Sequence, residues 1–362
     1  MKIVVTGTRG IPHILGGVET HCEELFPRIA GKGGDISIIR RKSYTNDFLT
    51  EYKGVKLIDL TTPRKKAFEA IIHTTKAVWY ARYKLRADII HIHAVGPASV
   101  APLARLIGLK VVFTHHGPDY ERDKWGKIAR FMLRMGERMG VTFANEVIVI
   151  SNVINELIIK KYRRENAHLI YNGVPLPEFF TDLDYLRSLK IESEKYIFAM
   201  GRFVPEKNFH QLIGAFASLK DKKDYRLVLA GDADFEDDYS RKLKQQAREN
   251  EVVLTGFVKG TQLQTLLTHA AFFVLPSSHE GLPISLLEAM SYHLPVLVSD
   301  IPANREIQIP EEYYFKVGNI AELSGKLQDY INWDMPKTDY AMDKYDWDTI
   351  AGQVIDVYNS LF

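Results

Sequence analysis

Short apolar runs alternate along the chain with longer segments in which apolar residues recur at helical spacing. The runs are rich in β-branched residues and are continuous rather than alternating, which is typical of parallel strands covered on both faces. We predict strands at residues 2–7, 36–41, 55–60, 87–93, 110–116, 146–151, 167–172, 195–201, 225–231, 251–256, 270–276 and 295–300. Strands that alternate with helices form βα units, so the pattern predicts an α/β protein with doubly wound sheets.

The segment after Asn208 shows how the helices are predicted. Its apolar residues recur at helical spacing, namely Phe209, Leu212, Ile213, Phe216 and Leu219. Asn is favoured at helix N-caps, so we expect this helix to begin just after Asn208, with Asn208 as its cap.

The chain is long enough for two domains. It has 362 residues, more than one ordinary core holds. The segment 172–180 contains two prolines and a turn, so we place the domain break there, between domains 1–173 and 174–346. The last residues, 345–362, form a further helical pattern that need not pack on the second domain.

The two halves differ in charge although the whole chain carries only +2. Residues 1–173 contain 28 basic and 16 acidic side chains, a net charge of +12, and the rest contain 19 basic and 29 acidic ones, a net charge of −10. This asymmetry indicates domains with different tasks, and the basic half favours an anionic surface or substrate.

The single cysteine, Cys22, excludes a disulfide within the chain and fits a reducing compartment. Its spacing to Val18, Leu25 and Ile29 predicts a small core residue.

No run approaches the roughly 18 apolar residues of a membrane span, and a glycine loop follows the N-terminal strand too early for a signal peptide. We therefore expect a cytoplasmic protein.

The motif EGLPISLLEAM (280–290) is the strongest chemical signal. Pro283 suits the first position of a helix, which leaves the backbone N–H groups of Ile284 and Ser285 free to bind a phosphate. Glu280 would lie in the loop after the strand, and Glu288 would lie in the helix, where a carboxylate can accept hydrogen bonds from a ribose. The alternative is an ordinary βα turn with a surface glutamate.

The motif GRFVPEKN (201–208) also follows a strand. Arg202 offers a planar fork to phosphate oxygens and Lys207 a compact charge, so together they suit a pyrophosphate, including one that gains charge as a leaving group. The alternative is a solvated basic loop.

Glycines and histidines mark further candidate positions. Gly16 and Gly17 permit close approach of the backbone to a ligand, although the dinucleotide fingerprint G-x-G-x-x-G is absent. His115 and His116 end a strand, where ligands bind in open α/β sheets, and since strands alternate faces only one can face the site; we choose His116. His93 ends another strand and is a candidate for the acceptor site. Each histidine has a structural alternative.

No metal site is predicted. Asp232 and Asp234 form a D-x-D pair, but more acids follow them, and a solvated acidic loop is the preferred interpretation. The histidines show neither H-x₃-H nor H-E-x-x-H spacing.

With these motifs in this order, GGVE near the start, GRFVPEKN and EGLPISLLEAM, the chain resembles the retaining glycosyltransferases of family 4 over nearly its whole length. The segments TGTRGIP and HHGPDYERDKW resemble most the bacterial members that build surface polysaccharides, including rhamnosyltransferase-like ones. The resemblance implies the GT-B fold, two Rossmann-like doubly wound domains that face a central cleft, with the final helix, about 347–362, returning to the first domain.

The resemblance also implies roles for individual residues. Arg202 and Lys207 would hold the donor diphosphate, Glu288 the ribose, and Glu280 would face the transferred sugar. The backbone of Val258 would border the base, while Gly16, Gly17 and His116 would approach the phosphates and the reacting carbon. The family needs no metal or other cofactor. Family members often have Phe-Gly where this chain has Leu282-Pro283, and Pro283 removes one backbone donor there.

The expected reaction is therefore metal-independent transfer, with retention, from a nucleotide-diphosphate sugar to a glycan or lipid-linked acceptor in surface polysaccharide synthesis, with no role for nucleic acid. The alternatives are a GT-B nucleotide-sugar epimerase, an NAD-dependent oxidoreductase with two Rossmann domains, and a non-catalytic carbohydrate-binding relative.

The segment 122–139 suggests peripheral contact with an anionic membrane on the inner face of the cell. Its cationic residues are Arg122, Lys124, Lys127, Arg130, Arg134 and Arg138. Its apolar residues are Trp125, Ile128, Phe131, Met132 and Met135. The alternative is a helix packed on the core with a basic outer face.

Overall fold

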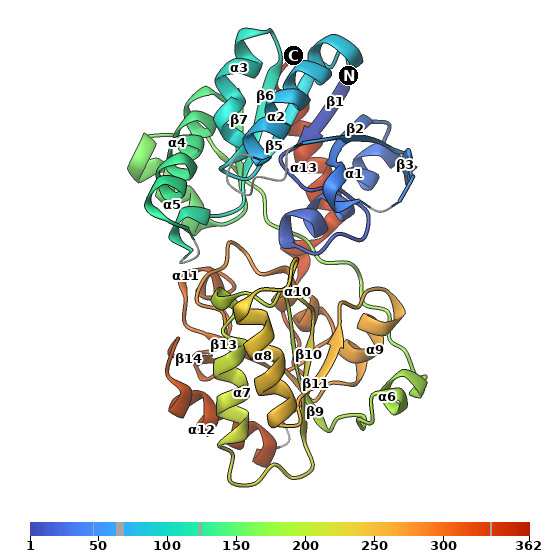
Figure 1. The fold of residues 1–362 in the computed structure, drawn as a ribbon, viewed down its shortest axis with the longest axis vertical. Coiled ribbons are helices and arrows are strands. Elements are labelled where there is room, and N and C mark those ends of the chain that lie inside the picture. The colour runs from blue at the N-terminus through green and yellow to red at the C-terminus, as the bar shows by residue number, and fades with distance from the viewer. Residues whose placement is uncertain (46, 63–68, 123–124, 334) are drawn as a thin grey trace. The chain divides into compact units, whose positions relative to one another are not determined.

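The computed structural model describes residues 1–45, 47–62, 69–122, 125–333 and 335–362. The chain divides into two compact units: unit 1 is Met1–Gly173 together with Lys344–Phe362, and unit 2 is Val174–Asp343 (Figure 1). Lys124, one of the cations of the segment 122–139 that is expected to contact a membrane, lies outside the described residues.

Unit 1 is built on an eight-stranded sheet with the order β3-β4-β2-β1-β5-β6-β7-β8. The strands are β1 (Lys2–Thr6), β2 (Asp35–Arg41), β3 (Glu51–Tyr52), β4 (Val55–Leu60), β5 (Ile89–His93), β6 (Lys110–His115), β7 (Glu146–Val149) and β8 (His168–Leu169). The pairings are parallel except that β3 runs antiparallel to β4. The chain builds outward from β1 first on one side and then, from β5, on the other, so the order reverses between β1 and β5.

The helices of unit 1 include one from the far end of the chain. They are α1 (Gly17–Gly31), α2 (Glu69–Tyr80), α3 (Ala101–Leu106), α4 (Lys127–Phe143), α5 (Asn152–Tyr162) and α13 (Trp347–Asn359). In Figure 1 the red α13 lies beside the blue α1, and the two helices are in contact. Trp347, Ile350 and Val354 share one buried cluster with Cys22 and Phe26. The expected core position of Cys22 is therefore confirmed.

Unit 2 is built on a six-stranded parallel sheet with the order β11-β10-β9-β12-β13-β14. Its strands are β9 (Tyr196–Met200), β10 (Arg226–Ala230), β11 (Val253–Gly256), β12 (Phe272–Leu275), β13 (Val296–Ser299) and β14 (Tyr314–Phe315). Its helices are α6 (Asp184–Ser188), α7 (Phe209–Ala217), α8 (Asp238–Glu249), α9 (Thr261–His269), α10 (Ile284–Ser291), α11 (Pro302–Arg305) and α12 (Ile320–Trp333). This is the doubly wound Rossmann order, with its reversal between β9 and β12.

Each predicted apolar run contains a strand, whereas the two-residue strands β3 and β14 were not predicted. The helix after Asn208 begins at Phe209, as predicted, but ends at Ala217, before Leu219. Asn208 is the N-cap of this helix, as predicted, but its side chain makes no capping hydrogen bond: its backbone is left-handed (φ 51°), and its side-chain N–H donates to the Pro276 carbonyl at 3.1 Å instead of accepting from the helix. In the described part of the chain no helix has the length and apolar character needed to cross a membrane.

Candidate functional site

The predicted residues of unit 2 other than Val258 follow β9 and β12, the two strands between which the strand order reverses. Ligands bind at such a point in open α/β sheets. Glycines let the backbones of β9 and β10 approach there: a Cβ on Gly231 would lie 1.9 Å from the carbonyl oxygen of Gly201. Gly231 has φ +136° and Gly201 has φ +153°, conformations that L side chains rarely adopt.

The loop after β9 is joined to the loop after β12. Besides the bond from Asn208 to Pro276, the Ser278 N–H donates to the Glu206 carbonyl at 2.9 Å. The Lys207 Nζ donates to Glu280 Oε1 at 2.5 Å, and both side chains are largely buried. The fold thus brings together a cation and a carboxylate that are 73 residues apart in the sequence.

The acids after β10 are ion-paired. Arg202 Nη1 lies 3.1 Å from Asp234 Oδ2, and Lys244 Nζ lies 2.8 Å from Asp232 Oδ1. The interpretation of this stretch as a merely solvated acidic loop is therefore incomplete, because both acids neutralise neighbouring cations. Arg202 and Lys207 are the two predicted ligands of a diphosphate, and each forms an ion pair with a carboxylate. An incoming phosphate would compete with the two carboxylates for these cations.

Helix α10 presents a narrow polar face at its start. Pro283 is the N-cap rather than the predicted first helical residue, so Ile284 and Ser285 are the first two residues of the helix. The N–H groups of Ile284 and Ser285 have no carbonyl within the helix to bond to. Pro283 lies before the helix, so its missing N–H does not reduce the number of free helical N–H groups. Ser285 and Glu288 are the partly exposed residues of an otherwise buried helix, three positions apart and so on one face.

Val258 completes the predicted residues of unit 2. It lies in the loop between β11 and α9, and its side chain is buried, with 8% exposed. Its side chain therefore anchors the loop, and the contact of its backbone with the base stays a prediction.

The glycine loop of unit 1 is held by an ion pair. Arg9 binds Glu19 through Nε, Nη2 and its backbone N–H, at 3.1, 3.0 and 3.0 Å. Gly16 is the N-cap of α1 with φ 145°, and a Cβ there would lie 2.2 Å from Glu19 Oε2. Gly16 therefore lets the loop close over this pair, and Gly17 opens the helix with nothing within 4 Å of its Cβ position.

Three histidines of unit 1 lie together: His93 at the end of β5, His116 just after β6, and His21 on α1. His93 Nδ1 and His116 Nε2 are 2.9 Å apart. The ring of His21 lies edge-on to that of His116, with centroids 4.8 Å apart, and His21 Nδ1 is 2.9 Å from Asn172 Oδ1. His93 and His116 were predicted from the sequence, whereas His21 and Asn172 were not, because His21 lies 72 residues from His93 and Asn172 lies 56 residues from His116.

The environment keeps these three rings neutral. Burial lowers the pKa of His21 to about 4, against a smaller opposing effect of the hydrogen bond to Asn172. Burial, followed by repulsion from neighbouring imidazoles, holds the pKa values of His93 and His116 well below the usual range. At neutral pH each ring therefore carries one proton and one lone pair.

His115 points into a different environment from His116, as strand alternation requires. Its Nε2 lies 2.9 Å from Oε1 of Glu137, a fully buried residue of α4. Tyr162 and Lys161 of α5 donate to Glu137 Oε2 at 2.6 and 3.1 Å. Burial acts to raise the pKa of Glu137, but the bonds and charges of His115, Tyr162 and Lys161 outweigh it and lower the value to about 2. This network was not predicted.

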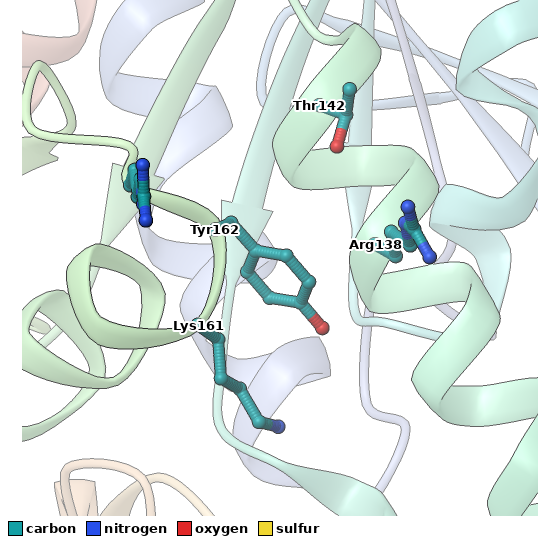
Figure 2. A pocket seen from close by; sticks show the side chains of 5 residues that line it. Arg138, Thr142, Lys161 and Tyr162 are labelled. Carbon is teal, nitrogen blue, oxygen red and sulfur yellow. The ribbon is translucent and has the colours of Figure 1, made fainter.

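A basic pocket of about 400 Å³ lies beside this network (Figure 2). It is lined by Arg138 and Thr142 of α4 and by Lys161, Tyr162 and Arg163 at the end of α5. The Tyr162 side chain in Figure 2 points toward α4, where its hydroxyl reaches Glu137. Glu137 neutralises one of its three cations, Lys161, so the pocket keeps a net positive charge that suits an anionic group.

The two halves of the chain match different family models. Residues 15–177 match the model described as "Glycosyltransferase Family 4", and residues 184–347 match "Glycosyl transferases group 1".

Individual proteins are similar over most of the chain. An uncharacterized glycosyltransferase of Methanocaldococcus jannaschii is 26% identical, over 99% of this chain and 98% of the relative. The Escherichia coli UDP-Gal:alpha-D-GlcNAc-diphosphoundecaprenol alpha-1,3-galactosyltransferase is 26% identical, over 84% of this chain and 81% of that protein. The crystal structure of Anabaena HepE in complex with UDP-glucose superposes with a TM-score of 0.81 at 20% identity, over 99% of this chain and all of HepE.

Proposed function

This chain is a glycosyltransferase of family 4 with the GT-B fold, and from that premise we propose that it moves a sugar from a nucleotide-diphosphate donor to a hydroxyl of a lipid-linked or other glycan acceptor. We propose further that it retains the anomeric configuration and needs no metal. The observation that carries the proposal is the pair Lys207–Glu280, fixed beside Arg202 in the loops at the reversal point of unit 2.

The chemistry of these groups suits a sugar diphosphate. The guanidinium of Arg202 and the ammonium of Lys207 stabilise the charge that develops on a departing diphosphate, and the N–H groups of Ile284 and Ser285 add a helix N-terminus. Glu288, on the same face of α10 as Ser285, would accept hydrogen bonds from the ribose. Glu280, oriented by Lys207, would face the transferred sugar.

The proposed reaction breaks the bond between the anomeric carbon and the donor diphosphate and forms one from that carbon to the acceptor oxygen. The acceptor proton passes to a leaving phosphate oxygen, so no nucleophile from the protein is required. The protein contributes positioning and charge stabilisation. On the unit 1 side, the Gly16–Gly17 loop and His116 would approach the donor, and His93, bonded to His116, would help to place the acceptor.

The donor's base can be identified by ligand binding. HepE was crystallised with UDP-glucose, and the relative from E. coli uses UDP-Gal, so UDP is the first nucleotide to test. Melting temperatures would be measured with UDP, GDP, ADP, dTDP and NAD, in EDTA and again with Mg²⁺. One diphosphate at about 100 times its Kd should stabilise the protein by about 2.7 kcal/mol in EDTA. Stabilisation by NAD alone, or only with Mg²⁺, contradicts the proposal.

The role of Lys207 is tested by Lys207→Ala, with Lys242→Ala, an exposed lysine of α8, as the matched control. Loss of one group that stabilises developing charge should lower kcat about 10²- to 10³-fold. The folded structure should persist, as circular dichroism would show. Near-normal turnover of the Lys207 variant would refute the role.

We also propose that α4 holds the protein against an anionic membrane, where a lipid-linked acceptor would lie. Ile128, Phe131 and Met135 recur along one stripe of α4 and are 77%, 65% and 36% exposed. Arg134 and Arg138 are exposed on the same helix, and the basic pocket adjoins its end. Exposed apolar residues flanked by cations suit the interface of an anionic bilayer. The helix also packs on the core through Gly136, Glu137, Gly140 and Val141, so the alternative of a core-packed helix with a basic outer face stays open, and the exposed apolar stripe is what supports membrane contact.

Sedimentation with phosphatidylcholine vesicles, with and without phosphatidylglycerol, tests this contact. Binding should require the anionic lipid, weaken with salt, and fall in the double variant Ile128→Ser, Phe131→Ser. Leu106→Ser, which removes an 83% exposed leucine of α3, is the control. Equal binding by both variants, or none by the unaltered chain, would count against membrane contact.

A further inference from the structure

We propose that His21, His93 and His116 form a binding site for a transition-metal ion of the Zn²⁺ type, and that its occupation inhibits sugar transfer. The inhibitory half of this inference rests on the proposed function, because it needs His116 near the reacting carbon. The binding half rests on unit 1 alone.

The three rings converge from separate elements of unit 1. One ligand-capable nitrogen of each lies within 4.8 Å of one from each of the others. A tetrahedral ion bound at about 2.0–2.1 Å holds its nitrogens about 3.3 Å apart. The most distant pair of nitrogens must therefore come about 1.5 Å closer when an ion binds.

The hydrogen bond between His93 and His116 uses one proton and one lone pair, so two of the three rings offer an ion a lone pair while it is intact, and binding through all three rings breaks it. The carbonyl oxygen of Asn172 can only accept, so His21 Nδ1 carries the proton and Nε2 the lone pair. A histidine oriented by a carbonyl at its far nitrogen is the usual arrangement of a metal ligand. Among the described residues, His21 Nε2 and His93 Nε2 are buried atoms with no hydrogen-bond partner. Such atoms are costly to bury, and a metal ion would satisfy them.

The ligand set selects the class of ion. Neutral imidazoles suit Zn²⁺, Cu²⁺, Ni²⁺ and Co²⁺, whereas Mg²⁺ and Ca²⁺ prefer oxygen ligands. Three histidines leave a fourth position for water or another ligand. His116 is only partly buried, so an ion has a way in from solvent. An ion bound there would hold His116 and add charge beside the donor, which is why occupation should stop transfer.

Cobalt provides a direct readout that needs neither donor nor acceptor. Titration of the full chain with Co²⁺ should give one ion per chain and the intense visible absorption of low-coordinate cobalt. His21→Asn and His116→Asn should each weaken binding tenfold or more. His73→Gln is the matched control, because His73 is also a fully buried histidine of unit 1 but lies outside the cluster.

The outcomes separate the two halves of the inference. Absence of cobalt binding, or equal binding by the two cluster variants and the unaltered chain, overturns the site. Since His116 is partly exposed, His116→Asn remains informative if His21→Asn does not fold. In transfer assays Zn²⁺ should inhibit the unaltered chain, reversibly with EDTA, but not His21→Asn. Full turnover at saturating Zn²⁺ overturns inhibition, and a chain that transfers no sugar but still binds cobalt refutes only the proposed function.

Discussion

Gly231 follows β10 at the point where the backbone passes closest to Gly201 after β9. Hydrogen bonds between backbone groups extend this approach: the Gly201 N–H donates to Ala230, and the Gly231 N–H donates to Gly256. The absence of a side chain at residue 231 thus sets the spacing of the loops that carry Arg202 and Asp234. Single residues without functional groups can therefore determine where functional groups lie.

Gly231→Ala should destabilise unit 2 by about 2–4 kcal/mol, because its Cβ would overlap a carbonyl oxygen and its φ is unfavourable for alanine. Gly214→Ala is the control: Gly214 lies within α7 with nothing within 4 Å of its Cβ position, so alanine should stabilise by about 0.5–1 kcal/mol. Urea unfolding measures both. Equal effects of the two substitutions would show that the close approach is unimportant.

Secondary-structure elements of unit 1 are joined by the buried carboxylate of Glu137. Its bonds link α4 to the end of β6 through His115 and to α5 through Lys161 and Tyr162. A buried carboxylate with this many partners is favourable only while it is charged. The attachment of α4, and with it the exposed stripe proposed to meet the membrane, therefore depends on pH.

The pKa of Glu137 is about 2 in the folded chain, against 4.5 for an unperturbed glutamate, a difference worth about 3 kcal/mol. A lowered pKa stabilises the fold above about pH 4.5, and this contribution is lost as the pH falls toward 2. Glu137→Gln should therefore be less stable at pH 7 and lose less stability between pH 5 and pH 3. Urea unfolding tests this, with Glu156→Gln on the exposed face of α5 as control. Parallel pH curves for Glu137→Gln and the unaltered chain would contradict the prediction.

The elements were largely predictable because the strands of both sheets, apart from β3, are parallel and mostly buried, so they appear as continuous β-branched runs. β3 and β14 have two residues each, too few for a pattern. Arg202, Lys207 and Glu280 could be named because parallel strands end at one edge of the sheet. Their ion pairs could not, because Asp234 and Glu280 come from other loops. The role of His21 could not be predicted, because a single histidine on a helix forms no sequence motif, and its nearness to His93 depends on how α1 packs beside β5.

At the scale of the whole molecule, unit 1 takes its residues from both ends of the chain. α13 contributes Trp347, Ile350, Val354 and Tyr358 to the cluster around α1. Tyr358 also reaches the β5 side of the sheet, where its hydroxyl lies 2.6 Å from His91 Nδ1. Unit 2 is thus inserted into unit 1, and the last helix is a part of the first core.

Trp347→Ala should destabilise unit 1 by about 3–5 kcal/mol, because the side chain is 1% exposed and packs against His21 with ring centroids 5.4 Å apart. Trp333→Ala is the control, since that tryptophan is 69% exposed at the end of α12 and should change stability by less than about 0.5 kcal/mol. Thermal unfolding monitored by circular dichroism compares the two. A loss of similar size for both would argue against α13 as a part of the core.

The insertion of unit 2 also delays the completion of the unit 1 core during synthesis. A ribosome that has just made residue 173 must still translate residues 174–346, roughly 10–35 s at typical elongation rates, before α13 emerges. During that interval Cys22, Phe26 and their neighbours lack the helix that covers them in the finished protein. Unit 2 is contiguous in the chain and can fold while unit 1 waits. The nascent chain therefore presents an apolar surface for chaperones to shield, and truncated translation products would aggregate through it.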